Sequence, residues 1–160
     1  MVSRLSVHIL QREQRLPGPP GDVFPFFADA HNLEAITPPW LGFRVVTPSP
    51  IEMRAGTLLE YRLRLHGVPV RWRTRIAVWD PPARFVDVQL SGPYRFWHHT
   101  HDFEPDGRGG TLMRDTVRYA LPLGPLGTLA HRLLVRRDLA EIFDFRQRAV
   151  VASLSKVKGS

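Results

Sequence analysis

Side chains that could do chemistry are concentrated in one stretch of the chain, residues 84–122. Two histidines, His99 and His101, alternate there with other residues, and the acids Asp87 and Asp115 lie before and after them. Imidazole and carboxylate groups can transfer protons, bind the polar part of a ligand or hold a metal ion. The chain has no cysteine, which excludes disulfides, thiolate catalysis and cysteine zinc sites.

Alternation of apolar and polar residues predicts that this stretch forms three antiparallel strands: 84–90, 95–104 and 111–121. Successive side chains of a strand point to opposite faces. His99 and His101 therefore share a face with Trp97 and Phe103, and Asp115 lies on the apolar face of the next strand. We expect these polar groups on the inward side of the sheet.

Two glycine-containing turns set the expected register of these strands. A turn centred on Gly107 and Arg108 joins the second and third strands, and a turn at Gly92 and Pro93 joins the first and second. Directly opposed residues have Cβ atoms within about 5.5 Å of each other. The turns predict three cross-strand pairs: His101 with Asp115, Asp87 with His99, and Gln89 with Trp97.

Three interpretations of this polar group remain open. In the first, the histidines and acids only satisfy one another, because a buried carboxylate is costly unless it is paired. In the second, they contact the carbonyl, hydroxyl or carboxylate of a ligand. In the third, His99, His101 and Asp115 catalyse acid–base chemistry, with Tyr61 or Tyr119 as a proton donor.

A metal site built from the two histidines and Asp115 is disfavoured. The histidines are two residues apart on one strand, so we expect their side chains to diverge unless the strand bends. Structural metal sites also use more ligands than the sequence offers. We therefore expect no metal and no other cofactor.

Composition limits the classes of partner. The 160 residues carry a formal net charge of +7, but the arginines alternate with apolar residues, which is typical of a solvated face and argues against a nucleic-acid site. The N-terminal residues lack the apolar stretch of a signal peptide, so we expect a cytoplasmic protein. A transient contact with a membrane surface is a further hypothesis, based on four arginines of the last helix: Arg132, Arg136, Arg146 and Arg148. The oligomeric state stays open.

The remaining elements must position the polar group. Alternation predicts four further strands: 4–15, 41–48, 57–66 and 70–79. Two short helices, 23–30 and 32–37, follow the first strand. Apolar residues at helical spacing predict one long helix over 126–154. We expect a single domain over residues 1–160, with 156–160 as a frayed tail.

This order predicts an α+β fold in which a curved, antiparallel seven-stranded sheet wraps around the long C-terminal helix. An antiparallel meander must bury one face, and only the last helix is long enough to cover it. The two short helices are expected to close the sheet where it bends. A hollow between sheet and helix is a natural place for a small-molecule site.

The chain resembles the START/Bet v 1-like superfamily, also called SRPBCC, and its bacterial polyketide cyclase/dehydrase-like members. Four stretches carry the resemblance: VFPFFADAHNLEAITPPWLGF, GPYRFWHHTHDFEP, GGTLMRDTVRYALPLGPLG and LLVRRDLAEIFDFRQRAV. The resemblance implies the helix-grip fold and a cavity for a hydrophobic or amphipathic ligand such as a lipid, quinone or polyketide. It implies no single reaction.

Binding, and possible transport, of such a ligand is the leading hypothesis for the function. A cyclase, aromatase or dehydratase that uses His/Asp acid–base chemistry is the alternative. The side chains expected to contact the ligand are mostly aromatic or belong to the polar group: Trp40, Phe43, Tyr61, Trp72, Asp87, Gln89, Trp97, His99, His101, Asp115, Tyr119 and Phe143.

Overall fold

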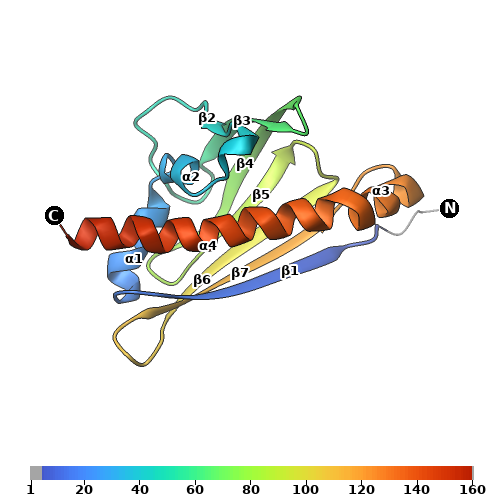
Figure 1. Ribbon diagram of the computed structural model, residues 1–160. Helices are drawn as coiled ribbons and strands as arrows, with labels where there is room; N and C mark the ends of the chain where they lie inside the picture. The colour runs from blue at the N-terminus through green and yellow to red at the C-terminus, as the bar shows by residue number, and fades with distance from the viewer. Residues whose placement is uncertain (1–4, 160) are drawn as a thin grey trace.

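The computed structural model describes residues 5–159 and consists of one curved sheet and a long helix (Figure 1). None of the helices in this part of the chain is long and apolar enough to cross a membrane. The elements, in chain order, are β1 (His8–Leu16), α1 (Pro20–Ala28), α2 (Asn32–Ala35), the 3-10 turn η1 (Pro39–Leu41), β2 (Arg44–Val45), β3 (Leu58–Leu65), β4 (Val68–Asp80), β5 (Arg84–Ser91), β6 (Phe96–Pro105), β7 (Thr111–Ala120), α3 (Gly124–Ala130), the π-helical turn η2 (His131–Val135) and α4 (Arg136–Lys158).

The sheet has seven antiparallel strands in the order β1-β7-β6-β5-β4-β3-β2. Strands β2 to β7 form a meander, and β1 returns to pair with β7. The pairing of β4 with β5 shifts register between Arg73 and Thr74 and again between Ile76 and Val78. Such irregularities bend a strand and increase its twist. The sheet therefore curves around the space in front of β5 and β6.

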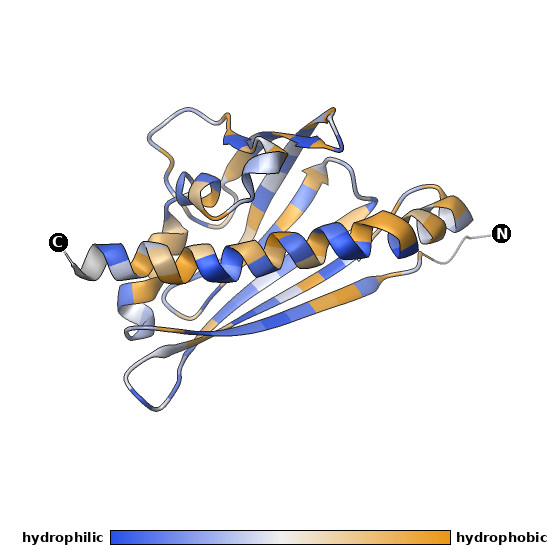
Figure 2. Cartoon of the chain, viewed as in Figure 1, coloured by the Kyte–Doolittle hydropathy of each residue, from blue (hydrophilic) through white to orange (hydrophobic). Residues whose placement is uncertain are grey.

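The long helix α4 crosses the concave face of the sheet, as Figure 1 shows. Apolar side chains along one side of α4 are buried against the strands. Figure 2 shows the alternation of hydrophobic and hydrophilic residues along this helix that produces its two faces. The buried residues of α4 are Leu139, Phe143, Val150 and Leu154.

The architecture confirms the expected curved seven-stranded sheet, long C-terminal helix and two short helices after the first strand. The strand expected over 41–48 was wrong in extent, because η1 occupies its start and β2 has only two residues. The helix continues to Lys158, four residues beyond its expected end. Ser160, part of the expected tail, and the start of the first expected strand lie outside the described residues.

The first turns of the C-terminal helix differ from expectation in their burial. Leu126, Leu129 and Leu133 recur at helical spacing, but they are 67%, 53% and 64% exposed. The helix is also not uniform, because the π turn η2 separates α3 from α4. In Figure 1, α3 lies at the far end of the helix from α1. The apolar face expected over the whole helix is therefore buried only in its α4 part.

Candidate functional site

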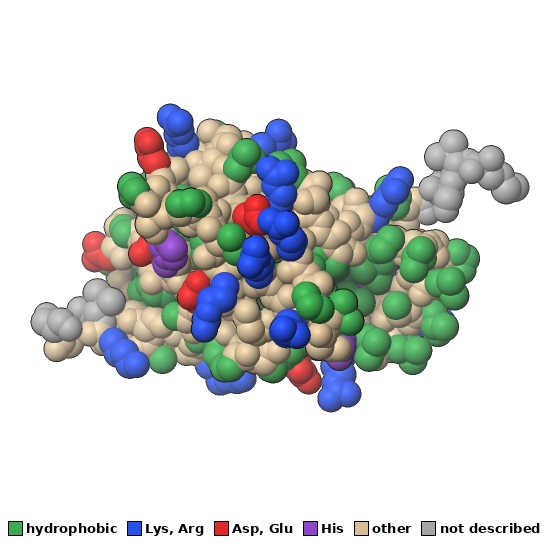
Figure 3. Space-filling view, turned by 90° about the horizontal axis from the view of Figure 1, so that it is seen from above, with side chains coloured by type: hydrophobic (Ala, Val, Ile, Leu, Met, Phe, Trp, Pro, Cys, Tyr) green, Lys and Arg blue, Asp and Glu red, His purple; other side chains and the backbone are tan. Residues whose placement is uncertain are grey.

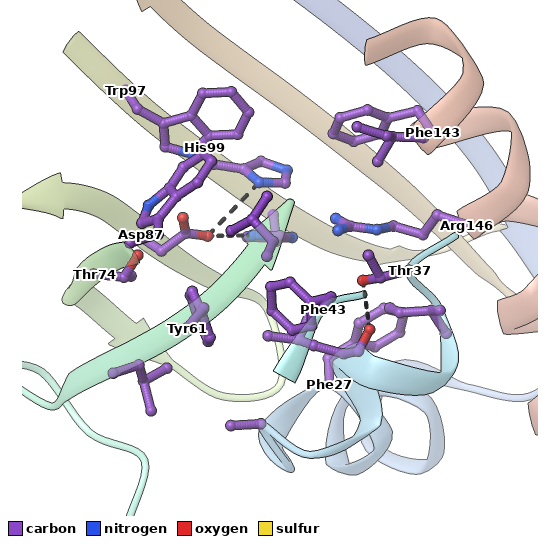
Figure 4. A pocket seen from close by; sticks show the side chains of 18 of the residues that line it. Phe27, Thr37, Phe43, Tyr61, Thr74, Asp87, Trp97, His99, Phe143 and Arg146 are labelled. Carbon is purple, nitrogen blue, oxygen red and sulfur yellow. Dashed lines mark hydrogen bonds and ion pairs between the residues drawn. The ribbon is translucent and has the colours of Figure 1, made fainter. Parts of the chain in front are cut away.

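A cavity of about 150 Å³ lies between the concave face of the sheet and α4. Its wall combines the aromatic residues of β3, β4 and β6 with α4 and the α1–α2 region (Figure 4). The side chains that line it are predominantly apolar: Phe27, Ala30, Leu33, Ile36, Thr37, Leu41, Phe43, Met53, Leu59, Tyr61, Leu63, Leu65, Trp72, Thr74, Ile76, Phe85, Asp87, Tyr94, Trp97, His99, His101, Met113, Leu139, Ile142, Phe143 and Arg146.

The polar part of this wall comes from neighbouring strands in the expected register. Asp87 of β5 lies opposite His99 of β6, and His101 lies opposite Asp115 of β7. His99, His101 and Asp115 are buried, and Asp87 is partly buried. Alternation of side chains in β6 places both histidines on the cavity side. The pairing predicted from the two turns is therefore confirmed for these four residues.

The shortest hydrogen bonds within this group run diagonally across the ladders. His99 Nε2 lies 2.8 Å from Asp115 Oδ1, and His101 Nε2 lies 2.8 Å from Asp87 Oδ2. The contacts between directly opposed residues are longer, 3.7 Å from His99 Nδ1 to Asp87 Oδ2 and 3.0 Å from His101 Nδ1 to Asp115 Oδ1. Each imidazole therefore lies between two carboxylates, and each carboxylate between two imidazoles.

The two acids of this group are held in their ionised form. Burial works to raise the pKa of Asp115, but hydrogen bonds from His101 and His99 and the charges of both rings outweigh it and hold that pKa well below its usual value. The pKa of Asp87 is lowered in the same way, against burial, by the hydrogen bond from His101 and by both imidazoles. Both carboxylates can then only accept hydrogen bonds.

The pKa values of the two histidines are shifted in opposite directions. Burial, followed by the charge of His101, lowers the pKa of His99 in spite of its bond to Asp115. Burial also opposes protonation of His101, but its contacts with Asp115 and Asp87 raise its pKa. His101 therefore takes up a proton more readily than His99 does.

An arginine from α4 faces this group across the cavity. Arg146 lines the cavity, and Figure 4 shows its guanidinium directed into it. Its Cζ lies 5.1 Å from the centre of the Phe143 ring, and its buried Nε has no hydrogen-bond partner. The positive charge of Arg146 also lowers the pKa of Asp87, after the larger effects of the two histidines.

The expectation that Arg146 belongs to an outward arginine face was therefore wrong. Arg146 follows Phe143 by three residues and Leu139 by seven, so all three lie on one side of the helix. This spacing was visible in the sequence and could have placed Arg146 inside. Arg132, Arg136 and Arg148, in contrast, are exposed.

A second buried donor in the cavity wall lacks a partner. The indole Nε1 of Trp72 is buried and makes no hydrogen bond. The Trp72 ring packs edge-on against Trp97, with 5.1 Å between ring centres, and lies 5.5 Å from the Tyr94 ring. The cavity thus has aromatic walls, and Trp72 Nε1 on β4 and Arg146 Nε on α4 are N–H donors in them that have no hydrogen-bond partner.

Eight of the twelve side chains expected at the ligand line the cavity: Phe43, Tyr61, Trp72, Asp87, Trp97, His99, His101 and Phe143. That any of them contacts a ligand stays a prediction. Most of the remaining lining was missed, because it comes from aliphatic residues that the sequence pattern cannot separate from ordinary core. Arg146 is the part of the missed lining with distinctive chemistry.

The other four expected residues do not line the cavity. Trp40 is in η1 and is 46% exposed. Gln89 makes two hydrogen bonds with the backbone of Tyr94, and its expected pairing with Trp97 is not part of the β5–β6 ladder. Asp115 lies behind the histidines. The hydroxyl of Tyr119 is 2.8 Å from Nε2 of His131, in the π turn.

The fold and the cavity define a helix-grip protein with an internal site between sheet and helix. The family model described as "Polyketide cyclase / dehydrase and lipid transport" matches residues 8–154. The chain therefore belongs to this family. No curated protein matches the sequence.

Solved structures of similar fold cover nearly the whole chain. The Zhui aromatase/cyclase from Streptomyces sp. R1128 aligns with a TM-score of 0.76 and 13% identity, over 94% of this chain and 95% of its own. A START superfamily protein from Mycobacterium smegmatis aligns with a TM-score of 0.69 and 11% identity, over 94% and 99%. A protein from Thermus thermophilus, TTHA0849, aligns with a TM-score of 0.65 and 23% identity, over 91% and 99%. These likenesses establish the fold alone.

Proposed function

We propose that this protein binds a small amphipathic ligand in the cavity between the sheet and α4. The observation that carries the proposal is the pair of buried, unpartnered donors, Arg146 Nε and Trp72 Nε1, in a cavity that is otherwise mostly apolar. A buried donor left without a partner costs about 1–3 kcal/mol. A ligand oxygen that accepts from these groups removes that cost.

The cavity volume limits the body of the ligand. A dry apolar cavity of this volume, about 150 Å³, holds a molecule of roughly the size of benzene. The aromatic rings of Tyr61, Trp72, Trp97 and Phe143 suit a flat, apolar ligand. We therefore expect a ligand built on one or two rings. A larger lipid, quinone or polyketide requires α4 or the loop that contains Met53 to move outward.

The charges around the cavity limit the polar end of the ligand. Arg146 carries a positive charge on one side, and the ionised carboxylate of Asp87 lies on the other, beside His99 and His101. A hydroxyl or enol can accept from Arg146 and donate to Asp87, whereas a ketone can only accept. A hydroxylated ring, such as a phenol or a hydroxy-ketone, can therefore form hydrogen bonds with both Arg146 and Asp87.

The surface of α3 and η2 supports an exchange of ligand at an anionic membrane. Five exposed leucines gather there: Leu123, Leu126, Leu129, Leu133 and Leu134. Exposed arginines lie in and next to this segment: Arg132 in η2, and Arg136 and Arg137 at the start of α4. Figure 3 shows hydrophobic side chains gathered at this end of the molecule. Apolar side chains with flanking arginines match the apolar and anionic parts of a lipid surface.

The alternative function, acid–base catalysis of a cyclisation or dehydration, has one supporting observation. Asp115 holds His99 and His101 from behind, while both rings line the cavity. A carboxylate in this position orients a histidine toward a reacting group. Catalysis predicts that His99→Gln abolishes turnover of a bound substrate while its affinity stays within a few-fold. Loss of affinity together with turnover favours binding alone.

Extraction and mass spectrometry of the purified protein test the binding proposal. A hydroxylated one- or two-ring compound is expected at about one molecule per chain from the wild type. Arg146→Leu is expected to lose most of it, whereas Arg148→Leu, on the exposed side of the same helix, should retain it. The proposal fails if no small molecule is recovered and no hydroxylated aromatic compound binds, or if both variants behave as the wild type.

A further inference from the structure

We propose that Asp87, His99 and His101 form a binding site for a divalent first-row transition-metal ion such as Zn²⁺, with Asp115 holding both imidazoles from behind. One donor atom from each of the three residues lies within 4.8 Å of the others. The expectation from the sequence, that two histidines in one strand diverge, does not hold. The ring centres of His99 and His101 are 3.7 Å apart, with 33° between the rings.

The two imidazoles use their nitrogen atoms in a shared pattern. Each ring presents one nitrogen to the same oxygen of Asp115: His99 Nε2 at 2.8 Å and His101 Nδ1 at 3.0 Å from Oδ1. Each presents its other nitrogen to the same oxygen of Asp87: His101 Nε2 at 2.8 Å and His99 Nδ1 at 3.7 Å from Oδ2. Asp87 Oδ2 and two ring nitrogens thus form one converging set of donors.

The distances within this set suit a metal ion. Zinc binds histidine nitrogen and carboxylate oxygen at about 2.0–2.2 Å, so two ligand atoms of a tetrahedral site lie roughly 3.4 Å apart. The observed separations of 2.8 Å and 3.7 Å from Asp87 Oδ2 lie on either side of that value. These two separations therefore differ from that value by only about half an ångström, and the third, between the two nitrogens, is at most 4.8 Å. The contact of 3.7 Å is too long for a hydrogen bond and leaves His99 Nδ1 available.

Asp115 supplies the support that metal-bound histidines need. Histidine ligands usually donate their second ring N–H to a carboxylate, which fixes the tautomer and the orientation of the ring. Asp115 Oδ1 is hydrogen-bonded to Nε2 of His99 and forms an ion-pair contact of 3.0 Å with Nδ1 of His101. Its charge and that of Asp87 together balance a divalent ion, so the buried site becomes neutral when the ion binds to the two unprotonated imidazoles.

The donor set indicates the class of metal. Two imidazoles and one carboxylate suit zinc, iron, cobalt or nickel, and the chain has no cysteine that would select a softer ion. Calcium takes six to eight oxygen ligands and magnesium an octahedral oxygen shell, so both fit poorly. Because all three ligand residues line the cavity, the remaining coordination position opens into it. A water molecule or a ligand oxygen completes the shell there.

Titration of the purified protein with Co²⁺, followed by visible absorption and by competition with Zn²⁺, tests this site. One Co²⁺ per chain with a four- or five-coordinate spectrum is expected. Two variants should abolish this band: His99→Gln, and Asp87→Asn, which keeps a polar group beside His101. Asp115→Asn should weaken the affinity for Co²⁺ by about 10–100-fold. Circular dichroism of each variant shows whether it is folded.

Two matched controls separate this site from surface histidines. His98→Gln changes the neighbouring residue of the same strand, outside the three donors. His131→Gln changes the ring that stacks on His8, 3.6 Å between centres, away from the cavity. Both variants should bind Co²⁺ as the wild type does. The site is overturned if the wild type gives no band, or if the band survives in folded Asp87→Asn and His99→Gln. The Co²⁺ titration contains no organic ligand, so its failure would not contradict the proposed ligand binding.

Discussion

His99 bonds to Asp115 diagonally across the β6–β7 ladder, although Val117 is the residue directly opposite it. The same diagonal reach joins His101 to Asp87 on the other side. One carboxylate of β7 therefore contacts both imidazoles of β6. Asp115 does not line the cavity, yet it determines how two of the residues that do line it are oriented.

Replacing Asp115 is expected to destabilise the fold. Asp115→Ala leaves two buried imidazoles without their shared acceptor, and breaking a buried ionic group by removing one partner costs about 3–5 kcal/mol. Urea unfolding measures this loss. Glu104→Ala, which removes an exposed acid 3.4 Å from Arg114, should change the free energy of unfolding by no more than about 0.5 kcal/mol. Equal effects of the two variants would contradict the structural role of Asp115.

Filling the cavity is expected to separate stability from binding. Ala30 is buried and lines the cavity, so Ala30→Leu places a larger apolar side chain in the empty space. Cavity filling typically raises the free energy of unfolding by about 0.5–2 kcal/mol. Affinity for a ring-sized phenol should fall at the same time. Ala55→Leu, at an exposed position, should change neither; unchanged affinity in Ala30→Leu would place the ligand elsewhere.

The leucine surface of α3 and η2 is expected to bind anionic vesicles. Sedimentation with phosphatidylglycerol vesicles should be weakened by the double change Leu126→Ser and Leu133→Ser. Added salt should also weaken it, because exposed arginines are screened. Leu58→Ser, which removes a leucine that is 51% exposed on β3, serves as the control. Equal sedimentation of both variants, or equal binding to neutral vesicles, argues against this surface.

Stability is expected to fall in mild acid through His131. Burial, followed by the charges of His8 and Arg136, lowers the pKa of His131 from its ordinary value of 6.5. The folded protein therefore favours the neutral ring. The resulting stabilisation is complete above the unfolded value and is lost as the pH falls below it.

Urea unfolding at about pH 7.5 and about pH 5.5 measures this effect of the histidine titration. His131→Gln keeps an acceptor for Tyr119 but cannot titrate, so its free energy of unfolding should decrease less than that of the wild type. Identical decreases in both proteins would show that His131 does not contribute.

The sequence was sufficient for the register of the central strands around the two histidines, although the predicted pair of Gln89 and Trp97 is not part of the β5–β6 ladder. The turns at Gly92 and Gly107 determine which residues of β5, β6 and β7 face one another, and alternation then places the histidines inside. Register does not determine hydrogen-bond partners, however, because an imidazole can reach a diagonal neighbour as easily as an opposite one. The crossed bonds of His99 and His101 therefore became visible only in three dimensions.

Arg146 and Tyr119 show two further limits of the sequence pattern. A charged residue on an amphipathic helix is usually solvated, so Arg146 was assigned to the outer face. Its side chain instead runs beside Phe143 into the cavity. The carboxylate of Asp87 there interacts favourably with the positive charge of Arg146. The pattern in β7 correctly buried Tyr119, but it could not predict the π turn that brings His131 to its hydroxyl.

Side-chain N–H signals in a ¹H–¹⁵N spectrum test the central claim most directly. During titration with a ring-sized phenol, the signals of Arg146 Nε–H and Trp72 Nε1–H should shift together and saturate at one ligand per chain. The indole signal of Trp40, which is 46% exposed and does not line the cavity, should stay in place. A saturable shift of Trp40 without Arg146 and Trp72, or no saturable shift with any hydroxylated aromatic compound, would contradict binding in the cavity.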